Sequence, residues 1–297
     1  MVDNKKNKEI ELLRFFATIL VVLGHSGFYI ITTSVSSMGC DWTKYILDET
    51  IIYKIIGFGT RIIYSCHMQL FILISGMVFQ ICLNGGKYKT VLGLLKNKIP
   101  RLIIPYFLVS ILYNIPILWC SNYFGGSVYN AFIDRVAKYW MWFLIGMFFV
   151  EFEDNIKRAL KDKTILKISG VFGAWMFSFL LVDKGKRFFL FEEQIFGIFF
   201  WYSICYWIIN RFPKVLNNRI LKLINMYSMD IYLYGVPVNY IIMTMLIHID
   251  DATHMNNITS LFLYVLRIFM QIIVGIAIPS ILKKLKYCKQ SINVRQT

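Results

Sequence analysis

Charged residues are scarce in this chain of 297 residues, making up 16% of it, against about 25% in a typical soluble domain. Apolar residues reach 57%, and the mean hydropathy is +0.57. This composition excludes a disordered chain, a collagen-like fibre, a small disulfide scaffold and an ordinary soluble enzyme. No long Gly/Ser-rich or Pro-rich linker divides the chain and no internal repeat is evident, so we expect one domain over 1–297.

Familiar nucleotide, metalloprotease and hydrolase motifs are also missing. The sequence contains no HExxH, no P-loop, no GxGxxG and no GxSxG. Its six cysteines form no CxxC pair, so we interpret them as buried free thiols and expect no metal. The net charge of +15 lies in short basic clusters between apolar segments, which favours a membrane protein over a nucleic-acid-binding one.

Eight apolar stretches approach or exceed the roughly 20 residues that a helix needs to cross a bilayer. They cover residues 10–33, 62–83, 102–120, 138–152, 165–182, 188–209, 223–247 and 261–282. The sequence therefore predicts an all-α, polytopic integral membrane helix bundle of eight transmembrane helices. Ten spans, two of them short or re-entrant, are the alternative.

The distribution of basic residues predicts the orientation. With the N-terminus placed in the cytoplasm, 23 of the 32 Lys and Arg residues fall on the inner side. Cytoplasmic loops of membrane proteins carry such an excess. We therefore expect a multi-pass protein of the cell membrane with cytoplasmic tails at residues 1–9 and 283–297.

The first apolar stretch carries an arginine and a histidine, Arg14 and His25, eleven positions apart. Eleven steps of about 100° complete about three turns, so both side chains share one helix face, about 16 Å apart along the axis. A histidine inside a membrane span usually faces the bundle interior. It serves there either in an interhelical hydrogen bond or as a general base or proton relay. Arg14 alone could be an interfacial anchor.

The second stretch begins near His67 and contains the small pair Ser75-Gly76. Small residues allow close helix contact, which is the packing interpretation of this pair. His67, near a helix start, could equally be an interfacial residue.

Basic residues and prolines mark the entry to the third stretch. Lys98 and Arg101 are three positions apart, so they share a face at a helix start, where the backbone dipole also favours anions. A plain positive-inside cluster would need neither Pro100 nor Pro105, so this segment could bind phosphate.

Two further charged residues lie within later spans. Asp230 falls in the seventh stretch and Arg267 in the eighth. Both need partners inside a membrane, and the sequence does not identify those partners.

Taken in order, these segments resemble the membrane-bound acyltransferase family 3, most closely its fucose 4-O-acetylase-like members that acylate cell-surface sugars. The resemblance rests on the spacing of Arg14 and His25, on His67-Met-Gln-Leu-Phe with Ser75-Gly76, and on short matches further along the chain. Those matches are Lys98, Arg101 and Pro105-Tyr106, then Trp142-Phe143-Leu144, and Ser228 with Tyr232-Leu233.

The resemblance implies an O-acyltransferase that moves an acyl group, usually acetyl, from cytoplasmic acyl-CoA to a hydroxyl of a glycan or glycolipid. It implies His25 as general base, and we expect Arg14 and His67 as further catalytic residues. Lys98, Arg101, Ser75 and Tyr106 are the expected donor-binding residues. We expect acetyl-CoA, the acceptor glycan and the lipid bilayer as partners, and no nucleic acid.

Two positions depart from the family pattern. Gln69 stands where the second-span motif usually has proline, and Gly235 stands where the seventh-span motif often ends in histidine.

The residues by themselves are consistent with acyl transfer, because a buried imidazole can accept a hydroxyl proton and an inner basic cluster can hold phosphates. A transporter or flippase for a lipid-linked sugar or small solute is the main alternative, with the buried charges as its path. A transporter should show repeats with paired broken helices, which are not evident here. A non-catalytic anchor or sensor subunit would not need Arg14 and His25 in line.

Overall fold

The computed structural model describes residues 8–27, 50–86, 154–161, 164–185, 189–247 and 256–294. Every regular element in these ranges is helical, as the all-α prediction requires. The helices are α1 (Lys8–Ser26), α2 (Ile51–Tyr64), α3 (His67–Asn84), α8 (Thr164–Asp183), α9 (Leu190–Arg211), α10 (Arg219–Met226), α11 (Ser228–Asp230), α12 (Val236–Ile247) and α13 (Asn257–Val294). A 3-10 turn covers Pro213–Asn217 and a π-helical turn covers Ile231–Gly235.

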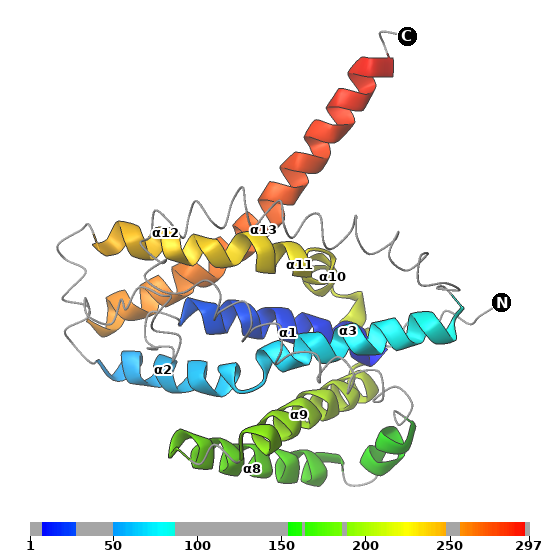
Figure 1. Ribbon diagram of the computed structural model, residues 1–297, viewed down its shortest axis with the longest axis vertical. Helices are drawn as coiled ribbons and strands as arrows, with labels where there is room; N and C mark the ends of the chain where they lie inside the picture. Colours follow the sequence, from blue (N-terminus) through cyan, green and yellow to red (C-terminus); the bar gives the residue numbers. More distant parts are fainter. Residues whose placement is uncertain are drawn as a thin grey trace, which may run out of the picture.

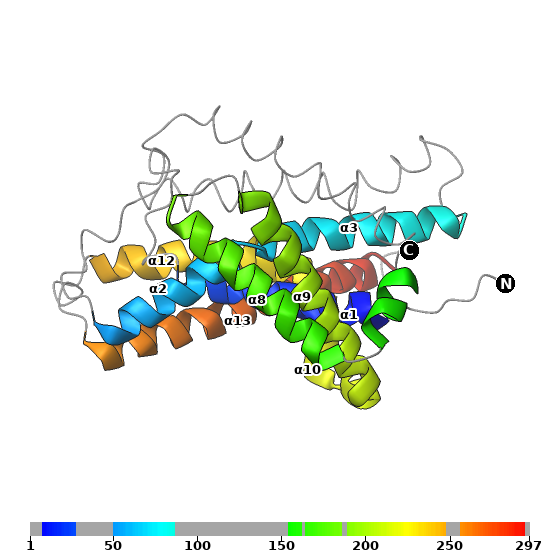
Figure 2. The same cartoon turned by 90° about the horizontal axis from the view of Figure 1, so that it is seen from below.

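Helix α1 lies at the centre of this arrangement (Figures 1 and 2). It contacts α2, α3, α9, α10, α12 and α13. Helices α8 and α9 pair as an antiparallel hairpin on one side, and α2 and α3 follow each other in nearly one line across the bundle. The C-terminal part of α13 extends beyond the other helices (Figure 1).

Three of the described helical stretches are long and apolar enough to cross a membrane. They are Ile51–Asn84, Thr164–Asp183 and Asn257–Lys284, with 34, 20 and 28 residues. They contain or match the predicted spans 62–83, 165–182 and 261–282. The predicted spans 102–120 and 138–152 lie outside the described residues, so the number of spans and the side of each terminus stay predictions.

The predicted boundaries need correction at two places. The second span was expected to begin at residue 62, but helix continues back to Ile51, with a break only at Ser65 and Cys66. The seventh was expected to begin at residue 223. Residues 223–226 instead end the short helix α10, which Asn218 caps by accepting a hydrogen bond from the backbone N–H of Ile220 at 2.8 Å. Asn218 and the turn at Tyr227 make α10 a separate element.

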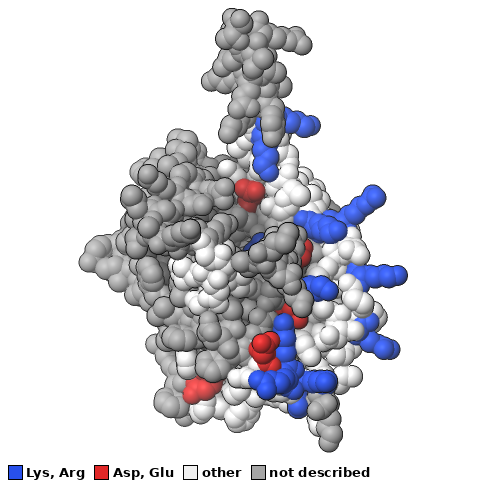
Figure 3. Space-filling model, turned by 90° about the vertical axis from the view of Figure 1, so that its right-hand side faces the viewer, with Lys and Arg blue, Asp and Glu red and all other residues white. Residues whose placement is uncertain are grey.

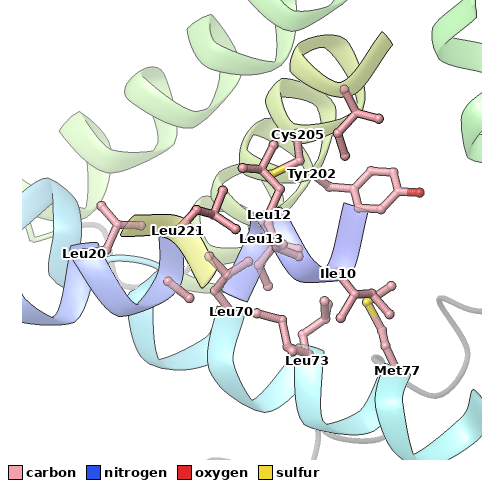
Figure 4. Close-up of a cluster of buried hydrophobic side chains, with 14 of the residues drawn as sticks. Ile10, Leu12, Leu13, Leu20, Leu70, Leu73, Met77, Tyr202, Cys205 and Leu221 are labelled. Carbon is pink, nitrogen blue, oxygen red and sulfur yellow. The ribbon is translucent and has the colours of Figure 1, made fainter. Parts of the chain in front are cut away.

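The apolar core forms where α1 crosses α3 and α9 (Figure 4). Leu12 and Leu13 of α1 are fully covered, and they pack with Leu70 and Leu73 of α3 and with Tyr202 of α9. In a bilayer, lipid tails are as apolar as leucine, so close packing rather than escape from water favours this core.

Many of the described basic residues lie at one end of the bundle, where α1 and α8 begin and α9 finishes (Figure 3). We call this the basic end, and it comprises Lys8, Lys157, Lys161, Arg211, Lys214, Arg219 and Lys222. Lys157 forms an ion pair with Glu9 at the start of α1, with Nζ and Oε1 3.3 Å apart. The sequence placed all seven residues on one side of the membrane, and the fold brings them to one end.

Candidate active site

Helix α1 is continuous from Lys8 to Ser26, so the predicted shared face of Arg14 and His25 lies on one unbroken helix. Thr18 and Val21, between them on that face, are buried, whereas Arg14 and His25 are half-buried. The Thr18 hydroxyl donates to the carbonyl oxygen of Arg14 at 2.9 Å. This face therefore turns inward along much of its length and separates the two polar side chains by about three turns.

His25 meets two aromatic side chains at the α2–α3 break. The hydroxyl oxygen of Tyr64 lies 3.3 Å from Nδ1 of His25, within hydrogen-bonding distance. The ring centroids of His25 and His67 are 6.1 Å apart, and those of Tyr64 and His67 are 4.7 Å apart. The fold thus brings together two predicted catalytic residues, His25 and His67, and adds Tyr64. We call these three residues the histidine cluster.

His67 is held by the helix that precedes it. Its Nδ1 lies 3.0 Å from the carbonyl oxygen of Ile63, and a carbonyl only accepts, so Nδ1 carries the proton and donates. Nε2 then offers a lone pair, and it is buried with no hydrogen-bond partner among the described residues. His67 is fully buried at 2% exposure, unlike the interfacial residue that its position at a helix start allowed.

The break at Ser65 and Cys66 is supported from α8. Trp175 donates from Nε1 to the Ser65 hydroxyl oxygen at 3.1 Å, while that hydroxyl donates to the carbonyl oxygen of Ile62 at 2.7 Å. Non-helical backbone inside a membrane protein is tolerated only where its polar groups are satisfied within the protein. These bonds satisfy the break between α2 and α3, which lies between Tyr64 and His67.

Glycines bring α1 against α2 beside the histidine cluster. A Cβ atom on Gly24 would lie 3.1 Å from Cγ2 of Ile63 and 3.2 Å from a ring carbon of Tyr64, and one on Gly27 would overlap Thr60. Gly24 therefore allows Ile63 and Tyr64 of α2 to lie directly against the backbone of α1.

Helix α13 contributes polar groups to the same region. Arg267 and Gln271 are completely buried. Arg267 donates from Nη2 to the carbonyl oxygen of His25 at 3.1 Å, and Gln271 donates from Nε2 to the hydroxyl of Ser26 at 2.6 Å. Both also bond to Oδ1 of Asn239 on α12, at 3.0 and 3.3 Å. These bonds identify the partners that the sequence left open for Arg267.

Asp230, in α11, has a different environment. Lys283 interacts electrostatically with its carboxylate, and Nζ of Lys283 lies 4.9 Å from the ring centroid of Tyr227. Ser280 donates to the Tyr227 hydroxyl at 3.1 Å. Lys283 of α13 is thus a cation that acts on Asp230 electrostatically, and it is well separated along that helix from Arg267.

Close packing against α13 explains why position 235 is a glycine. A Cβ atom there would lie 2.5 Å from the backbone oxygen of Gln271, and one on Gly275 would lie 2.5 Å from Cα of Ile231. The π-helical turn and α13 therefore approach backbone to backbone. A histidine side chain would not fit at this position in this packing.

The expected donor-binding residues are mostly outside the described part of the chain. Lys98, Arg101 and Tyr106 lie in residues that the structure does not describe, so their proposed roles stay predictions. Ser75 is exposed on α3, and Gly76 beside it is buried. The structure therefore does not join Ser75 to the histidine cluster.

Sequence reasoning did not single out Tyr64, Asn239 or Gln271. One signal was available for Gln271: Tyr264, Arg267 and Gln271 follow the spacing of one helix face within a long apolar stretch. Tyr64 and Asn239 had no comparable signal, because tyrosine and asparagine near a helix end are common.

Residues 7–129 match the family model for an acyltransferase domain, acyltransferase family 3. The matched segment contains α1, α2 and α3, and with them all three members of the histidine cluster. No curated protein and no solved structure matches the chain. The match supports the resemblance to membrane-bound acyltransferase family 3, and with it acyltransferase activity in a membrane protein.

Proposed function

We propose that this chain is a multi-pass O-acyltransferase of the cell membrane that moves an acyl group, most simply acetyl, from acyl-CoA to a hydroxyl of a cell-surface glycan or glycolipid. One observation carries the proposal: His25, Tyr64 and His67 meet inside an apolar helix bundle, within the segment that matches an acyltransferase domain. The fucose 4-O-acetylase-like group remains the proposed subgroup.

In the proposed reaction His25 acts as general base. The acceptor hydroxyl gives its proton to the imidazole while its oxygen forms a bond to the thioester carbonyl carbon. The carbon–sulfur bond then breaks, and the CoA thiolate leaves and takes the proton back from the imidazolium. Tyr64 lies at Nδ1 and orients the ring, so the nitrogen on the other side of the ring, Nε2, is the proposed proton acceptor.

The donor is proposed to enter from the basic end. CoA carries several phosphates, which arginine and lysine bind through charge-assisted hydrogen bonds. Lys98 and Arg101 are the proposed phosphate ligands, and Arg14 stands between the basic end and His25. The thioester must reach about 16 Å from the level of Arg14 to that of His25, which suits the long pantetheine arm of CoA.

His67 is the second candidate for the base. Its Nδ1 is engaged by the carbonyl oxygen of Ile63, which leaves Nε2 as an acceptor. The geometry favours His25 in one respect: its helix carries Arg14 on the same face, toward the proposed donor entrance.

The experiment has two arms. The purified full chain in lipid vesicles should release free CoA thiol from acetyl-CoA when a glycan acceptor is supplied. Mass spectrometry of surface polysaccharides should show acetyl groups that disappear when the gene is deleted. Unchanged polysaccharides together with no thiol release would reject the transferase, and uptake of a lipid-linked sugar by the same vesicles would favour the transporter.

A further inference from the structure

Helix α13 presents three polar side chains to α1 from one face. Tyr264, Arg267 and Gln271 are spaced by three and four residues, so they form a single stripe along an otherwise apolar helix. Arg267 and Gln271 are completely buried. A buried arginine in a membrane bundle is costly, and such residues usually mark functional positions.

The stripe contacts the last turn of α1, which ends at Ser26. The last four carbonyl groups of a helix have no partner within the helix. Tyr264 donates to the carbonyl oxygen of Leu23 at 3.2 Å, and Arg267 donates to that of His25 at 3.1 Å. Gln271 donates to the Val22 oxygen at 3.2 Å. Leu23 and His25 are among the last four residues of α1, and Val22 directly precedes them, so the side chains of α13 bind carbonyl groups along the end of this helix.

Arginine suits this place for two reasons. Its cation lies at the C-terminal end of α1, where the helix dipole is negative. Its planar fork also donates in two directions at once, from Nη2 to His25 and from Nε to Oδ1 of Asn239 at 3.0 Å. Because Asn239 belongs to α12, the fork ties α1 to two helices that lie far from it in the sequence.

We propose that Arg267 is a positioning residue for His25. It holds the backbone of His25 so that the imidazole stays against Tyr64 and His67, and it does not touch substrate. This inference rests on the proposed function, because the position of the His25 imidazole matters for catalysis only if His25 is the general base.

The test replaces Arg267 in the full chain and reads out both catalysis and the structure of α1. Arg267→Lys keeps the charge but loses the fork. Small displacements of a catalytic group can lower a rate by about 10²-fold, so we expect kcat to fall by about ten- to a hundredfold. The KM for acetyl-CoA should change less than about twofold, because the donor is proposed to bind at the basic end.

Two further measurements separate positioning from folding. In a His25→Gln background, Arg267→Lys should produce no further loss of turnover, because its effect acts through His25. Hydrogen exchange at residues 22–27 should become faster in Arg267→Lys, with exchange in α8 unchanged. Arg61→Gln is the matched control, since Arg61 is exposed, pairs with Asp183 at 3.1 Å and lies over the ring of Phe58. It should leave kcat and exchange in α1 unchanged.

The outcomes distinguish this inference from the proposed function. Unchanged exchange at the end of α1, or a full further loss of turnover in the His25→Gln background, would overturn the positioning role. If the unaltered chain transfers no acyl group, the proposed function fails, and the exchange measurement still decides whether Arg267 anchors α1.

Discussion

The polar groups at the centre of the bundle and those at its basic end are held in different ways. Around His25 the polar side chains are at least half-buried, and several bond to a helix distant in sequence, as Arg267 does across 242 positions. At the basic end, Lys8, Arg211 and Lys222 are exposed. The one ion pair described there, between Lys157 and Glu9, is partly exposed.

This difference predicts how each region responds to substitution. Substituting a buried polar group is costly, because its former partner is left as an unsatisfied hydrogen-bonding atom in an apolar surrounding. Exposed charges act mainly through their number and sign, and salt screens them. Single substitutions should therefore matter greatly at the centre and little at the basic end, except where a basic residue binds phosphate directly.

The first test is of membrane topology, where each reporter fusion signals either the inner or the outer side. Reporter fusions after Lys89 and Lys161 should report the cytoplasm, and a fusion after Asp251 should report the outside, because the basic loops favour the inner side. Alkaline phosphatase and fluorescent-protein fusions measure the two sides. An outside signal at Lys161 would remove the basis for calling the basic end cytoplasmic.

His25 should give the largest catalytic effect. We expect His25→Ala and His25→Gln each to lower turnover by about 10²–10⁴-fold, the usual size of general-base catalysis, with acetyl-CoA affinity nearly unchanged. Thiol-release kinetics of purified, equally expressed variants measure this. Gln keeps a hydrogen bond, so a well-folded His25→Gln protein with normal acetylation would falsify the assignment and favour His67 as base.

Lys98 and Arg101 test whether the predicted basic entry to the third apolar stretch binds the donor. Removing both with alanine should raise the KM for acetyl-CoA more than tenfold, because each charged hydrogen bond contributes about 1.5–3 kcal/mol. Initial rates over a range of acetyl-CoA concentrations give the KM. A double variant with unchanged CoA affinity would show that phosphate binds elsewhere.

Gly235 tests packing at the centre without any change of charge. Gly235→Ala places a Cβ 2.5 Å from the Gln271 backbone oxygen, so we expect a loss of about 1–3 kcal/mol in the free energy of unfolding. Gly173→Ala on α8 is the matched control, because a Cβ there meets nothing within 4 Å. Thermal unfolding in detergent compares them, and equal midpoints would contradict the close approach.

Lys157 should give the smallest effect. Removing its partly exposed pair with Glu9 by Lys157→Ala should cost about 0.2–1 kcal/mol of stability, and less at high salt. Thermal unfolding at low and high ionic strength measures this. A large rise in the KM for acetyl-CoA instead would place Lys157 among the phosphate ligands.

Long apolar helices were predictable from the sequence. The stretch predicted at 165–182 is helix Thr164–Asp183, because an apolar run between charged residues needs no tertiary contact to define its ends. The helix before residue 62 was missed, since Lys54, Gly57 and Arg61 interrupt the apolar pattern of α2. The exact start of the seventh span was missed because α10 is also apolar on one face.

For the candidate site, the sequence by itself determined what lies within one helix. The shared face of Arg14 and His25 follows from the periodicity of α1 alone. The polar stripe of α13 follows in the same way from the periodicity of α13. The tertiary structure decided which helix faces meet. It places Tyr64 beside His25, lets Arg267 donate to the His25 carbonyl oxygen, and packs α13 against Gly235. Those contacts join residues 36 to 242 positions apart, and helical periodicity cannot predict them because they depend on how the helices cross and where α2 breaks from α3.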